Sequence, residues 1–439
     1  MIDLIKGADI SSLLEVEAAG GRFYDQATGN RQQATGDGGT DCLGQSSDWP
    51  RNDRIETVSA AGAATGRPPE PVGADAHIGP SEPVGAELEE SRTYAHIGPP
   101  EDLLRILRRH GVNLIRLRLW NDPYDEAGKP YGAGTNDLAR TMELARRAKA
   151  AGLPWLLDFH YSDFWADPGK QYPPKAWASF NPEQLEQAIY AFTRETLETL
   201  RKADLLPAMV APGNELSNGL LWPLGKTPNW ENIARFVSAG LRAVKDSDPG
   251  IRTMIHLDNG GNNGLYRYWF DSYLAAGGAD FDCIGLSYYP FWHGSMESLG
   301  DNMQDLANRY GKPMIVVETS TAFTLTECNE YEGISRSEKR GLAANERTAA
   351  GVPYPMSPEG QAAFLRDLWA VIRSVPKDLG RGFVWWEPAW LPVKGSGWTT
   401  PEGLAYIRET GPGGNEWANQ GLFDYAGNAL PALKSLEKL

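Results

Sequence analysis

The sequence predicts a (β/α)8 barrel, on three observations. Short, continuously apolar runs alternate along the chain with longer segments of helical periodicity. Eight apolar runs follow this pattern, and polar residues stand at the end of nearly every one. Such runs separated by amphipathic helices indicate a parallel sheet covered by helices. Eight units with polar residues on one rim indicate a barrel whose site lies on that rim.

The strands and helices are predicted as follows. In chain order the strands are IKGADIS (5–11), NLIRLRLW (113–120), PWLLDFHYS (154–162), AMVAPGNE (208–215), RTMIHLD (252–258), DCIGLSYYP (282–290), MIVVETS (314–320) and GFVWWEP (382–388). The helices are predicted at 101–111, 136–152, 182–203, 229–248, 264–278, 296–311, 357–375 and 429–439. An open, doubly wound sheet is disfavoured, because no glycine-rich phosphate turn follows the first strand and polar residues end nearly every strand.

One segment interrupts this alternation. Residues 26–100 are rich in Gly, Ala, Pro and Ser, contain only two aromatic residues, Trp49 and Tyr94, and repeat EPVGA and AHIGP. Such a composition buries too little apolar surface to offset chain entropy. We therefore predict one barrel domain formed by residues 1–25 and 101–439, with a disordered insertion at 26–100. A small ligand-binding module is the alternative for the insertion.

The composition argues against several kinds of partner. The chain carries 42 basic and 57 acidic residues, a net charge of −15, which disfavours nucleic acid and anionic membranes. No run approaches the roughly 18 apolar residues of a membrane-spanning helix. The cysteines, Cys42, Cys283 and Cys328, are too scattered for a disulfide framework or a paired-ligand zinc site. Fifteen Trp and 17 Tyr offer flat faces for sugar rings, although most are expected to fill the core.

Two glutamates carry the predicted chemistry. Glu215 ends the predicted strand 208–215 and Glu318 lies near the end of 314–320, so both are expected at the same rim of a barrel. Two carboxylates flanking a scissile bond suffice for glycoside hydrolysis: one protonates the leaving oxygen, and the other attacks the anomeric carbon or activates water. Either glutamate alone could be a solvated rim residue. Both end strands too apolar to tolerate an unpaired charge, which favours the functional interpretation.

Four neighbours are predicted to support this pair. Asn214 directly precedes the first glutamate and can hydrogen-bond a sugar 2-hydroxyl. Arg116 and Arg118 share one strand face. Arg118, nearer the strand end, is predicted to keep the candidate nucleophile ionised, and Arg116 to form a structural salt bridge inside the barrel. Tyr288 is predicted to donate a phenol hydrogen bond to a carboxylate, and Trp386 to form a flat platform under a sugar ring.

Further polar and aromatic residues follow the predicted strands. His160, Asp163 and Trp165 come at and after the end of 154–162 and are predicted to bind or support a substrate. His293, in the loop YYPFWHG, is predicted to support the substrate loop or to be structural. A metal held by His160 and nearby aspartates is the alternative, disfavoured because no fixed ligand spacing supports it. We therefore predict no metal in the site. The sequence also lacks a nucleophile-elbow serine, a Walker loop and a cysteine placed beside a histidine.

The sequence resembles a known family. The motifs that carry the resemblance are KGADISSLLEVEAAGGRFYD, IRLRLWNDPYD, LLDFHYSDFWADPGKQ, PGNELSNGLLWPLG, LSYYPFWHG, VVETS and WWEPAW. Together and in this order they resemble glycoside hydrolase family 53, the arabinogalactan endo-β-1,4-galactanases, over nearly the whole chain apart from the insertion. The family belongs to a clan of retaining barrel enzymes. The resemblance implies that Glu215 is the acid/base, that Glu318 is the nucleophile, and that the substrate is galactan or a galacto-oligosaccharide.

The resemblance also bears on cofactors, location and assembly. It implies no required cofactor. Bacterial members often bind calcium in the loop after the seventh strand; here that loop, TLTECNEYEG, has Glu327 and Asn329 but Tyr331 in the alternating series, which disfavours a calcium site. The family is usually secreted, whereas MIDLIKGADISSLL shows no export signal, so an extracellular and a cytoplasmic location both stay open. We expect a monomer.

Three other functions stay open at this point. A retaining endoglycanase acting on β-mannan or β-glucan would differ mainly in loop geometry. A carbohydrate-binding protein on a catalytically silent barrel is disfavoured, because both carboxylates and their supporting residues are present. A barrel scaffold whose insertion recruits a partner is the third alternative.

Overall fold

The computed structural model describes residues 3–25, 99–328 and 341–439. The chain divides into two units, one formed by Met1–Thr28 with Tyr94–Leu439 and the other by Gly29–Thr93. The second unit lies outside the described residues, and so does the disorder predicted for the insertion up to residue 98.

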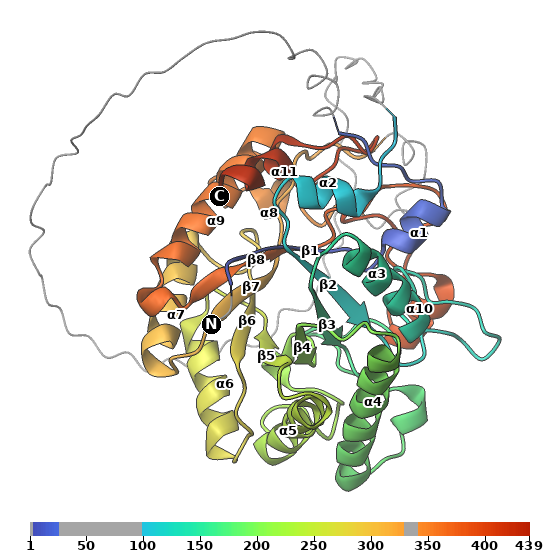
Figure 1. Ribbon diagram of the computed structural model, residues 1–439, viewed down its shortest axis with the longest axis vertical. Coiled ribbons are helices and arrows are strands. Elements are labelled where there is room, and N and C mark those ends of the chain that lie inside the picture. The colour runs from blue at the N-terminus through green and yellow to red at the C-terminus, as the bar shows by residue number, and fades with distance from the viewer. Residues whose placement is uncertain (1–2, 26–98, 329–340) are drawn as a thin grey trace, which may run out of the picture. The chain divides into compact units, whose positions relative to one another are not determined.

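Eight parallel strands form a closed barrel, which confirms the predicted fold (Figure 1). Each strand pairs with the next, and the last pairs with the first. The strands are β1 (Ile5–Asp9), β2 (Leu114–Leu119), β3 (Trp155–Phe159), β4 (Met209–Pro212), β5 (Arg252–Leu257), β6 (Cys283–Ser287), β7 (Met314–Thr319) and β8 (Gly380–Trp385).

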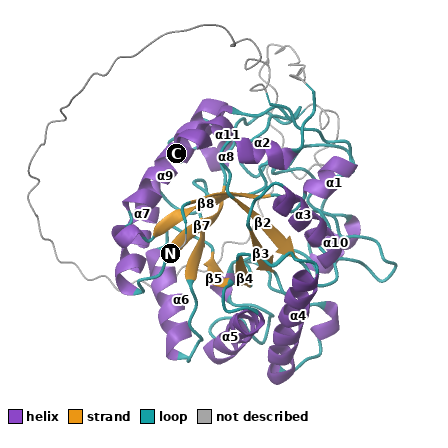
Figure 2. Cartoon of the chain, viewed as in Figure 1, coloured by secondary structure: helices purple, strands orange, loops and turns teal. Residues whose placement is uncertain are grey.

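Helices surround the sheet (Figure 2). The α-helices are α1 (Leu13–Ala18), α2 (Leu103–Arg109), α3 (Leu138–Ala150), α4 (Pro182–Lys202), α5 (Trp230–Ser247), α6 (Asn263–Ala275), α7 (Met296–Arg309), α8 (Glu346–Ala349), α9 (Pro358–Ser374), α10 (Pro401–Ile407) and α11 (Pro431–Ser435). The long ones begin at polar caps; Asn181, for example, forms a capping box with Gln184 at the start of α4. The prediction missed the short helices α1, α8 and α10. None of the helices described has the length and apolar character needed to cross a membrane.

The barrel interior has an apolar layer below a charged one. Two-residue alternation places Leu114, Arg116 and Arg118 on the inner face of β2. Leu114 belongs to a buried cluster to which every strand contributes, with Ile5, Leu156, Met209, Ala211, Met254, Cys283, Ile315, Val317 and Val384. The two arginines lie further along β2, toward the carboxyl ends of the strands. The apolar layer therefore closes the barrel beneath the polar side chains.

A β-bulge changes the direction of Glu318. In the pairing of β6 with β7, Leu286 is opposite Val316, but the next residue, Ser287, is opposite Glu318. Val317 of β7 is thereby the extra residue, with no residue of β6 opposite it in the register. Since Val317 already faces the barrel interior, strict alternation would turn the following side chain outward. The extra residue lets Glu318 face the interior as well.

Candidate active site

A cavity of about 230 Å³ opens at the carboxyl ends of the strands. Of the residues singled out from the sequence, its walls contain Arg118, His160, Trp165, Asn214, Glu215, His293, Glu318 and Trp386. Asp163 and Tyr288 are not among its lining residues. Most of the predicted set thus meets in one place, although several members have partners other than those expected.

Glu215 lies in a turn directly after β4. The strand ends at Pro212, before the predicted boundary, and Gly213 and Glu215 then adopt positive φ angles of 118° and 47°. A left-handed conformation is uncommon for a residue other than glycine, and it persists only where the surroundings hold it. Ser287 Oγ, at the end of β6, donates a 2.6 Å hydrogen bond to Glu215 Oε1. The turn and the serine together fix the position of this carboxyl group.

A buried histidine fixes the direction of that hydrogen bond. His256 Nε2 lies 2.8 Å from Ser287 Oγ, and the backbone N–H of Glu215 faces His256 Nδ1 at 3.5 Å. Burial, together with the charge of Arg116, lowers the pKa of His256 to about 3, so the ring is neutral. Its single hydrogen then lies on Nε2 and is donated to Ser287, whose own hydrogen goes to Glu215 Oε1. Oε2 of Glu215 is left as the oxygen that can carry a proton.

Glu318 has a cation and a phenol as partners. Its Oε1 lies 2.7 Å from Arg116 Nη2, and its Oε2 accepts a 3.1 Å hydrogen bond from Tyr289 Oη. Burial raises the pKa of Glu318 above its ordinary range, and the charge of Arg116 opposes this. Both partners stabilise the carboxylate anion. Of the two glutamates, Glu318 is therefore the better placed to be ionised.

The roles predicted for the two arginines need correction. Arg116, predicted to be structural only, is the arginine that contacts Glu318. It does form the predicted salt bridges inside the barrel, to Asp9 at 2.5 Å and Asp158 at 2.8 Å. Arg118, the arginine nearer the strand end, has no ion pair with Glu318, but its charge also acts to lower the pKa of Glu318, as predicted.

Arg118 instead connects the charged layer to the aromatic wall of the cavity. Its guanidinium pairs with Asp9 at 2.9 Å and with Glu387 at 2.5 Å. The same group lies over the rings of Trp165 and Trp386, at 4.8 and 5.4 Å from their centroids. Cations stack favourably on indole faces, so Arg118 holds these two rings in place.

The phenol donor is the neighbour of the predicted tyrosine. Tyr288 Oη donates to the backbone oxygen of Gly294 at 3.0 Å, whereas Tyr289 Oη donates to Glu318. The expectation that Tyr288 reaches a carboxylate is therefore wrong. Tyr289 lies two residues after the inward-facing Ser287, so alternation counted from that serine would have selected it.

We expect the two tyrosines to respond differently to loss of the hydroxyl. Tyr289→Phe should lower kcat about 10- to 100-fold, because a hydrogen bond to a charged group contributes about 1.5–3 kcal/mol. Tyr288→Phe is the matched control, since it loses only a bond to a backbone oxygen, and its kcat should stay within about threefold. Initial rates of the parent and of the two variants measure both effects. Equal losses in the two variants would contradict the assignment of Tyr289.

A third carboxyl group strengthens the proton affinity of Glu215. Asp258, directly after β5, is buried and lines the cavity. Burial raises the pKa of Glu215 well above its ordinary range, and the charges of Glu318 and Asp258 raise it further. The hydrogen bond from Ser287 acts in the opposite direction but does not reverse the shift. Of the two glutamates, Glu215 is therefore the better placed to hold a proton and Glu318 the better placed to hold the charge.

Asp258→Asn is expected to move the alkaline limb of the pH–rate profile to lower pH. Removing a negative charge near Glu215 lowers its pKa, so the proton needed for acid catalysis is lost at a lower pH. Profiles of kcat/KM against pH for the parent and the variant measure the shift. Asp280→Asn, at an exposed aspartate paired with Lys312, is the control and should leave the limb in place. If the alkaline limb of Asp258→Asn stays at the same pH or moves to higher pH, Asp258 does not raise the pKa of Glu215.

Asn214 and His160 support the loop that follows β3. Asn214 Oδ1 accepts from Arg116 Nη2 at 2.9 Å, and its Nδ2 donates to the backbone oxygen of Ala166 at 2.9 Å. The second hydrogen on Nδ2 remains for a ligand, so the predicted contact to a sugar hydroxyl stays a prediction. His160 Nδ1 accepts from the backbone N–H of Ala166 at 3.1 Å, while Nε2 lies 3.2 Å from Asp158 Oδ2. Both ring nitrogens of His160 thus face protein atoms, which disfavours the metal alternative.

Asp163 has a structural position, contrary to its predicted role at the substrate. Its Oδ1 accepts from the backbone N–H of Asp122, and its Oδ2 accepts from the backbone N–H of Lys175 at 2.7 Å and lies 3.0 Å from Lys175 Nζ. The chain turns at Tyr161, with φ of 48°, between the strand end and Asp163. This turn directs the carboxylate to the neighbouring loops instead of the cavity.

Five tryptophans, more than any other residue type, line the cavity. Trp165 stacks on Trp398 at 4.4 Å between centroids, and Trp386 packs on Trp417 at 4.6 Å. The prediction missed Trp398 and Trp417, which come from the long segment after β8; the density of tryptophans there was the available signal. His293 Nδ1 lies 3.0 Å from the backbone oxygen of Ser287, and burial lowers its pKa to about 4. A neutral His293 therefore braces the turn after β6.

The prediction also missed the acidic partners of the arginines. Glu387 Oε2 accepts a 2.5 Å hydrogen bond from Ser12 Oγ, and Glu387 Oε1 accepts from the Ser12 backbone N–H at 3.1 Å. The carboxylate of Asp9, in β1, pairs with both Arg116 and Arg118. These partners come from opposite ends of the chain, and no local pattern in the sequence links them.

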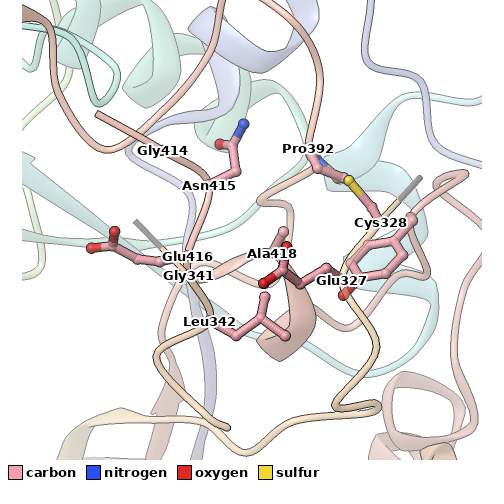
Figure 3. A pocket seen from close by; sticks show the side chains of 10 residues that line it. Glu327, Cys328, Gly341, Leu342, Pro392, Gly414, Asn415, Glu416 and Ala418 are labelled. Atoms are coloured by element: carbon pink, nitrogen blue, oxygen red, sulfur yellow. The ribbon is translucent and has the colours of Figure 1, made fainter. Parts of the chain in front are cut away.

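A second, smaller cavity lies between the segments that follow β7 and β8. It measures about 20 Å³ and is lined by Glu327, Cys328 and Asn415, among others (Figure 3). That space holds about one water molecule. Of the residues considered for calcium, Asn329 and Tyr331 lie outside the described residues. In the part of the chain that is described, no three His, Cys, Asp or Glu side chains are grouped so as to hold a metal ion.

The fold and the cavity together define a class of enzyme. A (β/α)8 barrel with two carboxyl groups facing a tryptophan-walled cavity at the carboxyl ends of its strands has the arrangement of a glycoside hydrolase. Residues 81–436 match the family model described as glycosyl hydrolase family 53. The chain belongs to this family and is a glycoside hydrolase.

Similar proteins extend over most of the chain. A Bacillus subtilis (strain 168) protein named endo-beta-1,4-galactanase is 36% identical over 359 residues, which cover 78% of this chain and 80% of the relative. A Niallia circulans protein named only by its position in the bgaB 5' region is 42% identical over 348 residues, or 77% and 87% of the two chains. The solved structure of the Ignisphaera aggregans GH53 catalytic domain has a TM-score of 0.76 at 34% identity, covering 99% of this chain and 96% of that one.

Proposed function

We propose that the protein is an endo-β-1,4-galactanase that hydrolyses galactan by a retaining double displacement. The name of the Bacillus subtilis relative, endo-beta-1,4-galactanase, supports galactan as the substrate. The observation that supports the mechanism is the asymmetry of the two glutamates: Glu318 lies beside Arg116 and Tyr289, whereas Glu215 lies beside neutral donors and a second carboxyl group. One glutamate is thus suited to carry charge and the other to carry a proton.

The first step transfers the sugar to the protein. A Glu318 oxygen attacks the anomeric carbon and forms a glycosyl ester as the bond to the leaving oxygen breaks. Glu215 gives its proton to that oxygen, so the departing chain leaves as a neutral alcohol. The positive charge that develops on the sugar ring lies in a cavity whose charged residues include several carboxylates, which stabilises it.

The second step releases the sugar. Glu215, now ionised, takes a proton from water, and the water oxygen attacks the anomeric carbon as the bond to Glu318 breaks. Both glutamates return to their starting protonation states. Two inversions at one carbon give net retention, and the only co-reactant is water, so no cofactor is required.

Substrate comparison tests the proposed specificity. Purified β-1,4-galactan, β-1,4-mannan and β-1,4-glucan are incubated with the parent protein, and reducing ends are measured over time. We expect release from galactan well above that from the other two polymers. Release from mannan or glucan with none from galactan would indicate another endoglycanase, and no release from any of them would indicate a silent binding barrel.

A further inference from the structure

An exposed tryptophan stands at the edge of the active-site cavity. Trp292 is 45% exposed, one of three large apolar side chains with such exposure in the described residues. The other two, Tyr268 and Leu274, belong to α6 on the outside of the barrel. Trp292 instead lies in the loop between β6 and α7 and lines the cavity that contains both glutamates. Leaving a large ring in water at this position suggests that a ligand covers it.

The ring of Trp292 is held in a fixed orientation. It makes an edge contact to Phe291 at 4.6 Å and another to Trp417 at 5.5 Å, and it packs on Tyr289 at 5.5 Å. Its backbone N–H donates to the backbone oxygen of Tyr289 at 3.0 Å. A ring fixed from several sides costs little further entropy when a ligand stacks on it.

A second hollow begins on Trp292. It measures about 490 Å³, about twice the active-site cavity, and lies between the loop after β6 and the segment that leads from α8 to α9. Trp292 lines both spaces. Phe291, Met296 and Tyr354 supply further apolar surface to the hollow, and Ser295 and Thr348 supply hydroxyl groups. We call this hollow the Trp292 groove.

The chemistry of the Trp292 groove fits a neutral sugar chain. Its lining includes no Asp, Glu, Lys or Arg, although the protein as a whole has a net charge of −15. Flat aromatic faces with a few hydroxyl groups suit the apolar faces and the hydroxyl groups of hexopyranoses. An acidic polysaccharide would find no cation in the groove to pair with its carboxylates.

We propose that the Trp292 groove binds further galactosyl units of the same galactan chain whose scissile bond lies between Glu215 and Glu318. The proposal rests on the proposed function, and continuity through Trp292 supports it. A polymer longer than the cavity must leave it along the surface, and this groove adjoins it. The groove thereby favours long chains over short ones and sets the length of the products.

Gly351 allows the groove to be blocked without disturbing the core. It lines the Trp292 groove but not the active-site cavity, and a side chain added there meets nothing within 4 Å. Gly351→Phe should therefore fill part of the groove, whereas Trp292→Ala removes its platform. Tyr268→Ala, at an exposed aromatic residue on α6, is the matched control.

The test compares kcat/KM on long galactan with kcat/KM on 4-nitrophenyl β-galactobioside, a short substrate with only two galactosyl units. We expect the ratio of the two to fall about 5- to 10-fold in both groove variants, the size of a lost ring contact, and to stay at the parent value in Tyr268→Ala. Products from galactan should also change in length. Thermal melting curves show whether each variant is folded.

The outcomes separate the groove from the proposed function. If the parent cleaves galactan but a folded Gly351→Phe and a folded Trp292→Ala both keep the parent ratio, the groove proposal is wrong and the galactanase proposal stands. If the parent does not cleave galactan, the proposed function is wrong and the groove proposal falls with it. A fall in the ratio for both groove variants, with none in Tyr268→Ala, supports the groove.

Discussion

Glu318→Gln is expected to lower kcat on β-1,4-galactan by about 10⁴- to 10⁶-fold, because it removes the group that we propose forms the covalent intermediate. The amide is isosteric with the carboxylate and can still accept from Tyr289 Oη, so the fold should persist. Arg116 keeps two other carboxylates, Asp9 and Asp158, as partners. The melting temperature of the variant should therefore stay close to that of the parent.

Glu215→Gln should behave differently, because the need for its proton depends on the leaving group of the substrate. We expect a loss of about 10²- to 10⁴-fold on galactan, where the leaving alcohol needs a proton. A nitrophenyl leaving group needs little protonation, so formation of the glycosyl ester of Glu318 should be nearly normal in Glu215→Gln. The ester then hydrolyses slowly and a burst of nitrophenol appears. A burst in Glu318→Gln would contradict the role of Glu318 as nucleophile. The absence of a burst in Glu215→Gln would contradict the role of Glu215 as acid/base.

Arg116→Met is expected to have the largest effect on stability. Arg116 is fully buried and contacts three carboxylates, on Asp9, Asp158 and Glu318. Removing the shared cation leaves those carboxylates buried and incompletely paired, and breaking a buried pair in this way costs about 3–5 kcal/mol. Urea unfolding measures the loss. Arg146→Met, at an exposed arginine paired with Glu143, is the control and should cost about 1 kcal/mol or less.

The stability loss in Arg116→Met should depend on pH. Burial acts to raise the pKa of Asp158, but the charge of Arg116 together with the contact to His160 outweighs burial and holds that pKa at about 2. A carboxyl group with a depressed pKa contributes stability above its ordinary value of 3.8, and this contribution is lost as the pH falls toward 2. The difference between parent and variant should therefore be full at neutral pH and narrow below about pH 4. A difference that grows as the pH falls would contradict the role of Arg116.

The sequence was sufficient to predict the barrel, for a physical reason. Strands buried on both faces are mostly apolar, so each of the eight left a visible run, and all eight are confirmed. Strand ends were less certain. The run 208–215 predicted a strand up to Glu215, but Pro212 ends β4 and the following residues form a turn. Apolar character shows that a segment is buried, and it does not show where the backbone changes direction.

Side-chain directions were predictable only where the strands are regular. Arg116 and Arg118 do share one face of β2, as alternation predicts. The direction of Glu318 depends on the bulge at Val317, and a bulge has no signature in a single strand. The partnership of Ser12 with Glu387 joins the first and last strand units of the barrel, so it follows from closure of the sheet and from no local motif.

The stereochemistry of the first product tests the central proposal most directly. Galactan hydrolysis is followed by ¹H NMR from the first minutes, before mutarotation mixes the anomers. A double displacement through Glu318 predicts that the β-anomer appears first and the α-anomer grows in later. An initial α-anomer would show a single displacement by water, and Glu318 could then not be the nucleophile.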